Sequence, residues 1–268
     1  MILFKKIISF FRRYLFKHPV YTFTYIFSFF LKDFSFKIHF YSQDEMVKFL
    51  REGKSILRFG DGDMVSIPLD LQHTAGKPDE RIKKWYRTIV AEYQRSSPYI
   101  LSIPRFLNLS NEDIKKIGPR KFNLWLPVKV MFLLNFNKKV SYMDSHNFYY
   151  DNYFEKVVAP VFYDKKIIFV VNKVMADKQR ANINLPWKDI VYVEAPPYNA
   201  IDAYDEIVSN INNALEKYNK KDIVLFIAIG PVAKHLVYEY AHKGYQSIDL
   251  GRYADVMFTG ESIQQFSI

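Results

Sequence analysis

The stretch DIVLFIAIGPVAKHLVYEYAHKGYQSIDLG, from Asp222 to Gly251, decides the fold class. An almost wholly apolar run predicts a strand over Asp222–Gly230. The helical spacing that follows predicts a helix over Pro231–Gly244, and a shorter apolar run predicts a strand over Tyr245–Gly251. Two strands joined by a helix of this length lie parallel in one sheet. This unit therefore indicates an α/β protein.

The chain before this unit shows the same alternation. Strands are predicted over Lys166–Asn172 and Ile190–Ala195, and a helix is predicted over Ala200–Tyr218. Repeated alternation of strand and helix is typical of a parallel sheet covered by helices. We therefore expect a Rossmann-like, mostly parallel sheet with helices on both faces.

The N-terminal part of this body begins with a helix over Ser42–Gly53, because Ser42 and Glu45 form a capping-box pattern and a glycine follows. A short strand is predicted over Ser55–Phe59, closed by a turn with the sequence GDGD. Residues 79–136 have mostly helical periodicity interrupted by prolines, and the order of their elements stays open. No internal repeat is present.

Charge and composition narrow the function classes. The chain has 268 residues, 38 Lys and Arg against 28 Asp and Glu, and a formal charge of +10. Residues 1–40 hold seven basic residues and one acidic residue, so most of the net charge lies there. The rest has no broad cationic surface of the kind that nucleic acid requires, and we expect no nucleic-acid partner. The absence of cysteine excludes disulfides, thiol nucleophiles and thiolate metal sites.

The first 40 residues are expected to form a separate basic extension. Met1–Lys17 has the pattern of a basic amphipathic helix, and Pro19 ends it. The aromatic run Val20–Leu31 is shorter than the roughly 20 residues that span a bilayer as a helix. We interpret residues 1–40 as an anchor on an anionic membrane surface, and residues 41–268 as a separate α/β domain. The alternative is a helical hairpin packed on the body or on a partner subunit.

The first candidate site is RFGDGD, from Arg58 to Asp63. Gly60 and Gly62 allow a ligand to approach the backbone closely, and Arg58 can bind a phosphate. Asp61 and Asp63 can direct two carboxylates toward one divalent cation, which would in turn bind a diphosphate. The alternative is an acidic turn that caps the following helix.

The second candidate site lies where the strand ending at Gly230 meets the helix that begins with Pro231. A helix N-terminus at the carboxyl edge of a parallel sheet is an anion site, but the sequence is neither a P-loop nor a dinucleotide fingerprint. The segment EAPPYNAIDAYDEI adds Asn199 and Asp202, which are expected at the same sheet edge and could contact nucleotide or sugar hydroxyls. Otherwise Asn199 is an ordinary N-cap, and Asp202 favours a helix dipole.

These three segments, in this order, resemble the bacterial GT-D glycosyltransferases over roughly Asp44 to Gly251. The resemblance implies a domain that binds a nucleotide sugar, usually a UDP-sugar, with a divalent cation such as Mn²⁺. It also implies work in surface polysaccharide or glycoprotein synthesis, with a glycan, lipid-linked or glycoprotein acceptor. Asp61 and Asp63 match the metal and donor motif of the family, in which the second acid is usually glutamate.

Two segments depart from the family pattern. Arg252 stands where the family commonly has a histidine, and arginine cannot bind a metal. Our hypothesis is that Arg252 lies against the donor diphosphate and supplies part of the missing charge. Residues 172–186 also lack the acidic, glycine-rich loop of the family, which puts the choice of donor and acceptor in doubt.

The resemblance implies hexosyl transfer by residues 41–268. Because nucleotide sugars are made in the cytoplasm and residues 1–40 are interpreted as a membrane anchor, we expect a peripheral enzyme at the cytoplasmic face of the cell membrane. The candidates for the base that takes the acceptor proton are Asp61, Asp202 and His146, and the sequence does not choose among them. Two other functions remain open. One is a non-catalytic membrane adaptor with a degenerate nucleotide-sugar pocket, and the other is an enzyme of phosphosugar transfer. The sequence leaves the oligomeric state undetermined.

Overall fold

A computed structural model of the chain describes residues 35–66, 79–149, 152–182, 185–187 and 189–259. Seven strands form one sheet in the order β3-β2-β1-β7-β6-β4-β5, and every pair of neighbours is parallel. The strands are β1 (Ser55–Arg58), β2 (Tyr99–Ile103), β3 (Met143–Asp144), β4 (Lys166–Asn172), β5 (Ile190–Ala195), β6 (Ile223–Ala228) and β7 (Ser247–Asp249). The predicted parallel sheet is confirmed.

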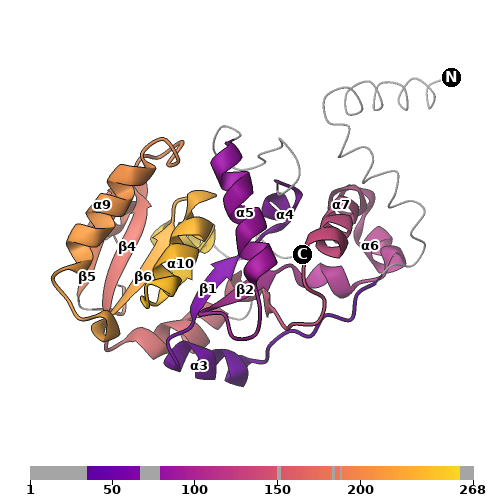
Figure 1. Cartoon of the computed structure of the whole chain (residues 1–268), viewed down its shortest axis with the longest axis horizontal. Coiled ribbons are helices and arrows are strands. Elements are labelled where there is room, and N and C mark those ends of the chain that lie inside the picture. The colour runs from indigo at the N-terminus through magenta and orange to yellow at the C-terminus, as the bar shows by residue number, and fades with distance from the viewer. Residues whose placement is uncertain (1–34, 67–78, 150–151, 183–184, 188, 260–268) are drawn as a thin grey trace.

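Helices surround this sheet (Figure 1). They are α3 (Gln43–Arg51), α4 (Asp61–Ser66), α5 (Glu80–Glu92), α6 (Asn111–Ile117), α7 (Pro119–Asn135), α8 (Lys173–Asn182), α9 (Tyr204–Leu215), α10 (Val232–His242) and α11 (Tyr253–Thr259). Short 3-10 or π turns occupy Arg105–Asn108, Asn147–Tyr149, Phe154–Val158, Ala159–Phe162 and Lys220–Asp222. Within the described residues, no helix combines the length and the apolar character needed to cross a bilayer.

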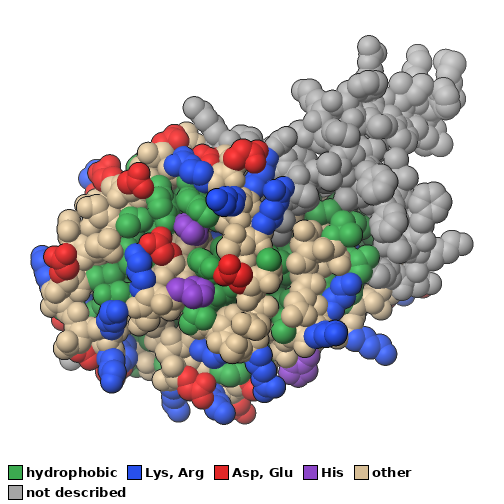
Figure 2. Space-filling model, viewed as in Figure 1, with side chains coloured by type: hydrophobic (Ala, Val, Ile, Leu, Met, Phe, Trp, Pro, Cys, Tyr) green, Lys and Arg blue, Asp and Glu red, His purple; other side chains and the backbone are tan. Residues whose placement is uncertain are grey.

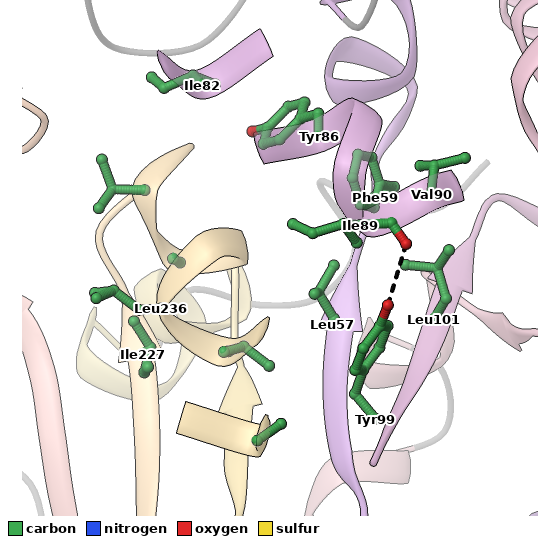
Figure 3. Packing of buried hydrophobic residues seen from close by; sticks show 14 of the residues in the cluster. Leu57, Phe59, Ile82, Tyr86, Ile89, Val90, Tyr99, Leu101, Ile227 and Leu236 are labelled. Atoms are coloured by element: carbon green, nitrogen blue, oxygen red, sulfur yellow. Dashed lines mark hydrogen bonds between the residues drawn. The ribbon is translucent and has the colours of Figure 1, made fainter. Parts of the chain in front are cut away.

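Buried side chains form a core on each face of the sheet, because successive residues of a strand point to opposite faces. In β4, Ile168 and Val170 join the cluster under α5, α7, α9 and α10, while Phe169 joins the cluster under α3 and α11. Figure 3 shows the first cluster, where Tyr99 on β2 donates a hydrogen bond to the Ile89 carbonyl of α5. The prediction of helices on both faces is therefore confirmed.

Local sequence explains most helix ends. The predicted capping box is present, since Glu45 N–H donates to the Ser42 hydroxyl and the Glu45 carboxylate accepts from Ser42 N–H at 2.8 Å. Pro231 precedes the first residue of α10 with a φ of −57°. Proline is common at the start of a helix because its ring fixes φ near the helical value. The N–H that proline lacks would have no acceptor within the helix at this position.

Residues 79–136 are mostly helical, as expected, and they also contain β2, because the largely apolar run YILSI is fully buried inside the sheet. Two other expectations were wrong in detail. The GDGD segment is not only a turn, since Asp61 already begins α4. The helix predicted from Ala200 begins at Tyr204 instead, after a turn in which Asp202 N–H donates to the Asn199 carbonyl.

The extension predicted over residues 1–40 lies mostly outside the described residues. Its last part contacts the body, because Phe36 packs edge-on against Phe132 with ring centroids 4.7 Å apart. Ile38 is buried and exchanges hydrogen bonds with the Asn108 side chain. On the face seen in Figure 2, basic and acidic side chains are interspersed.

The strand order places two series of strands side by side. The β1, β2 and β3 series runs to one edge of the sheet, and β4 to β7 occupy the other side, so the series meet where β1 pairs with β7. Ligands of parallel α/β sheets bind outside the carboxyl ends of the strands, near such a change of direction.

Candidate functional site

A pocket of about 530 Å³ lies at the carboxyl ends of the strands. The segments that follow β1, β3, β4, β5, β6 and β7 all contribute to its walls. Every predicted site residue except Asp202 lines it: Arg58, Gly60, Asp61, Gly62, Asp63, Asn199, Gly230, Pro231 and Arg252. The expectation that the separate motifs meet at one sheet edge is therefore confirmed for these residues.

Two residues of the pocket wall, Asp63 and Lys234, form a buried ionic group with Asp249. The Lys234 ammonium lies 3.3 Å from Asp63 Oδ2 and 3.4 Å from Asp249 Oδ2. The side chain of Lys234 is 8% exposed, that of Asp63 11% and that of Asp249 1%. Burial by itself would lower the pKa of Lys234, but the carboxylates of Asp249 and Asp63 outweigh it and raise that pKa above its usual value. Lys234 is therefore a cation held in a fixed position.

Asp63 has two further donors. The Gly60 N–H donates to Asp63 Oδ2 at 2.9 Å, and the Tyr86 hydroxyl donates to Oδ1 at 3.0 Å. Tyr86 is a buried residue of α5 (Figure 3), and burial together with the Asp63 charge raises its pKa well above the usual value. The hydroxyl therefore stays protonated and keeps donating to the carboxylate.

Arg58 lines the pocket from beneath. Its guanidinium donates to the backbone carbonyls of Leu250 and Ser145, and it lies 4.8 Å from the ring centroid of Phe148. Because Nη1 and Nη2 are used in this way, Arg58 connects the ends of β1, β3 and β7. Arg58 therefore adds a positive charge to the pocket, but its two terminal nitrogens are already engaged and are not placed to bind a phosphate in a bidentate way.

Asp61 and Arg252 line more exposed parts of the pocket, and Asp202 lies outside it. Asp61 Oδ1 accepts the N–H of Gly62 at 2.8 Å, within the first turn of α4. The Arg252 side chain is 74% exposed and lies 3.8 Å from an Asp255 carboxylate oxygen. Asp202 is exposed on the turn before α9, outside the residues that line the pocket.

Asn199 and Gly230 give the pocket its backbone shape. Asn199 has a left-handed φ of 53°, so it forms a turn and is not the N-cap of α9, which is Ala203. Gly230 has a φ of 66° between β6 and α10. Glycine suits this position because side chains disfavour that conformation.

His146, on the loop after β3, brings an imidazole to one end of the pocket. Its Nδ1 lies 3.6 Å from Oδ1 of the buried Asp144, which also accepts the His146 N–H at 3.0 Å. The His146 side chain is 26% exposed. This histidine therefore has both a nearby carboxylate and access to the pocket.

The carboxylates do not form an evident cation site. Among the described residues, no three His, Asp or Glu side chains group in a way that could hold a metal ion. Asp63, one of the two predicted ligands, already receives Gly60 N–H, Tyr86 O–H and the Lys234 ammonium. Asp61 remains, on the rim. The described residues therefore do not fit the predicted Mn²⁺ site.

The sequence interpretation missed Lys234 and Asp249. Lys234 carries a signal in retrospect, because it is the third residue of α10 and a lysine in the first turn of a helix opposes the helix dipole. Such a lysine needs a compensating acid. The contact with Asp249 depends on β6, β7 and β1 being neighbours in the sheet, which no local pattern reveals.

Comparison with known proteins places this fold. The sequence matches the model of the family described as "Glycosyltransferase GT-D fold" over residues 56–256. None of the curated proteins matches it. A solved structure of the domain of unknown function 1792, described as having a distinct glycosyltransferase fold, superposes with a TM-score of 0.65 and 21% identity, covering 84% of this chain and 83% of that one.

A second solved structure, described as a new glycosyltransferase from Streptococcus sanguinis, gives the same TM-score of 0.65 at 20% identity, covering 84% of this chain and 87% of that one. These two likenesses concern the fold. The family match shows more than the fold, because it extends over most of the chain. It includes the carboxyl end of every strand described and every residue that lines the pocket. With the parallel sheet and its pocket in agreement, the chain belongs to the GT-D fold family of glycosyltransferases.

Proposed function

We propose that the pocket binds a nucleotide diphosphate sugar, with UDP-hexoses as the first candidates, and that the enzyme transfers the hexose to an acceptor hydroxyl. The observation that carries this proposal is the pocket itself, which combines a fixed ammonium, the N-terminus of α10 and a glycine-lined wall. These features suit a diphosphate, whose oxygens accept hydrogen bonds and whose charge needs compensation.

The transfer breaks the bond between the anomeric carbon and the β-phosphate oxygen, and it forms a bond from the acceptor oxygen to that carbon. The nucleoside diphosphate leaves with the bonding electrons, and the acceptor proton passes to a base. Lys234 and the first turn of α10 lie where they can stabilise the charge on the leaving diphosphate. Of the three candidate bases, Asp61 and His146 line the pocket, and we propose that one of them takes the proton.

The acceptor is proposed from the family as a glycan, a lipid-linked sugar or a glycoprotein of the bacterial surface. We also propose that residues 1–40 hold the enzyme on the anionic cytoplasmic face of the cell membrane, because seven basic and fourteen aromatic residues lie there. Co-sedimentation of the full chain with anionic and with neutral lipid vesicles tests this part. Equal binding to both vesicle types, or binding to neither, would contradict it.

The donor is tested first by calorimetry and thermal shift with UDP, UDP-glucose, UDP-galactose and UDP-N-acetylglucosamine, on the wild type and on Asp63→Ala. Saturable binding by the wild type that the variant loses is the expected result, because Asp63 positions Lys234 and Gly60. Asp205→Ala is the matched control, since Asp205 is an exposed acid in the first turn of α9. Slow release of UDP from one of the sugars would identify the donor.

The predicted Mn²⁺ dependence stays a prediction, and the same titrations with and without Mn²⁺ measure it. The product separates the other functions. Release of a nucleoside monophosphate would indicate phosphosugar transfer, while binding of no nucleotide sugar would favour the non-catalytic adaptor.

A further inference from the structure

We propose that Lys234 occupies the place of a divalent cation in this pocket, so that the donor diphosphate binds without a metal ion. The inference rests on the proposed function, because it assumes that the pocket receives a nucleotide diphosphate. It departs from the metal dependence that the sequence resemblance implies.

The position of Lys234 is the first argument. Its side chain is 8% exposed and lies between two carboxylates that come from different strand ends, Asp63 after β1 and Asp249 at the end of β7. Lys234 also lines the pocket, beside Gly230 and Pro231 at the start of α10. A positive charge is thus fixed at the spot toward which the two buried carboxylates point.

The charge balance is the second argument. A site built for a divalent cation gathers carboxylate oxygens whose negative charge the cation neutralises. Here the charges of Asp63 and Asp249 are already matched by the Lys234 ammonium, 3.3 and 3.4 Å away, and by the buried guanidinium of Arg58. A metal ion that entered beside Asp63 would have to displace or repel the Lys234 ammonium at 3.3 Å.

The geometry of an ammonium group is the third argument. It carries three protons, and its nitrogen lies 3.3 Å from Asp63 Oδ2 and 3.4 Å from Asp249 Oδ2, so at most two of these protons are directed at the carboxylates. The third can be donated to a phosphate oxygen that enters the pocket. The two carboxylates lie on either side of the ammonium group and hold it in this position.

The candidate suggested by the sequence, Arg252, is less suited to this role. Its side chain is 74% exposed and lies near Asp255, so solvent screens its charge. Lys234 is buried, and a buried charge acts more strongly on a neighbouring phosphate. We therefore assign the fixed charge to Lys234 and a position at the rim to Arg252.

The test uses the full chain and two probes, UDP and inorganic pyrophosphate, titrated by calorimetry in buffer with EDTA and in buffer with Mn²⁺. Pyrophosphate is included because its binding does not depend on which base the donor carries. We expect the wild type to bind at least one probe with an affinity that differs by less than about threefold between the two buffers.

Three variants measure the contribution of Lys234. Lys234→Met should weaken binding in EDTA by about ten- to a hundredfold, which is the usual effect of one charge-assisted hydrogen bond in a buried site. Lys234→Arg should retain part of the affinity. Lys243→Met is the control, because Lys243 is exposed at the other end of α10. If Lys234→Met does not fold, the double variant Lys234→Met, Asp249→Asn restores the buried charge balance.

The outcomes are distinct. Metal-independent binding that is lost in Lys234→Met or in the double variant supports the inference. Binding that requires Mn²⁺ overturns the inference and leaves the proposed function standing. Unchanged binding by the folded Lys234 variants also overturns it. A wild type that binds neither probe in either buffer contradicts the proposed function, and the inference fails with it.

Discussion

Gly251 lies so close to Arg58 that a Cβ atom on Gly251 would stand 2.8 Å from the guanidinium Nη1. Gly251 also has a left-handed φ of 53°. The segment after β7 therefore passes against the Arg58 guanidinium at the base of the pocket, and a side chain at position 251 would force that guanidinium to shift.

The first prediction follows from this contact. Gly251→Ala should lower the free energy of unfolding by about 2–4 kcal/mol, because it adds the clash with Arg58 to the strain of a left-handed alanine. Gly244→Ala isolates the strain, since Gly244 has a φ of 80° and no atom within 4 Å of the added Cβ. Urea unfolding of both variants measures the difference. Equal losses would show that Arg58 moves aside without cost.

The candidate bases can be separated by release of UDP from the identified donor. Asp202→Asn should keep the wild-type rate within about twofold, because Asp202 is exposed and outside the residues that line the pocket. His146→Gln or Asp61→Asn should lower the rate by about a hundredfold or more if that residue is the base. UDP affinity is the control, since loss of a base should leave it unchanged. A large effect of Asp202→Asn would contradict the assignment.

Arg252→Ala should weaken UDP binding by less than about tenfold at low salt, and the difference should disappear at high salt, because an exposed charge is screened. Lys221→Ala is a suitable comparison, since Lys221 is exposed at the opposite end of β6. Calorimetry at two salt concentrations gives both values. A salt-independent loss of a hundredfold would instead place Arg252 in direct contact with the diphosphate.

The last prediction concerns acid stability. His235 stacks on Trp85 with ring centroids 4.0 Å apart, and burial lowers its pKa from 6.5 to about 4 despite the nearby Glu239. Between these values the unfolded chain binds a proton that the folded chain does not. The neutral His235 therefore contributes its full share to the free energy of unfolding above about pH 6.5. This contribution is lost as the pH falls toward 4.

Urea unfolding at pH 7.5 and pH 5 measures this effect. The wild type should lose about 2 kcal/mol more than His235→Phe between the two conditions. The same substitution at His242, which is exposed at the end of α10, should leave the pH dependence of the wild type in place. Parallel losses in the wild type and His235→Phe would contradict the prediction.

The outcome of the sequence interpretation depends on how local each signal is. The strands β4, β5, β6 and β7 were predicted because long apolar runs alternate with helical spacing. The strand β2 was not placed, because a short apolar run between helices has no period that distinguishes it from them. The start of α9 was misplaced because Asn199 has the chemistry of an N-cap, while its backbone is left-handed.

The site shows the same division. Residues directly after strands could be assigned to one pocket, since parallel strands end at the same edge. The ionic group could not be predicted, because Asp63, Lys234 and Asp249 meet only through the neighbouring positions of β1, β6 and β7. Local sequence patterns therefore predict the position of the pocket, but the ion pairs inside it depend on tertiary contacts.

The join between β1 and β7 also has a mechanical consequence. The two series of strands meet there through a single register pair, Ile56 with Ile248, below the base of the pocket. A ligand that contacts the loops after β1, β6 and β7 would stabilise the pairing of β1 with β7. It would bind only when both halves of the sheet are assembled. Amide hydrogen exchange in β1 and β7 should then slow when a ligand occupies the pocket, because a bound ligand favours the fully assembled domain.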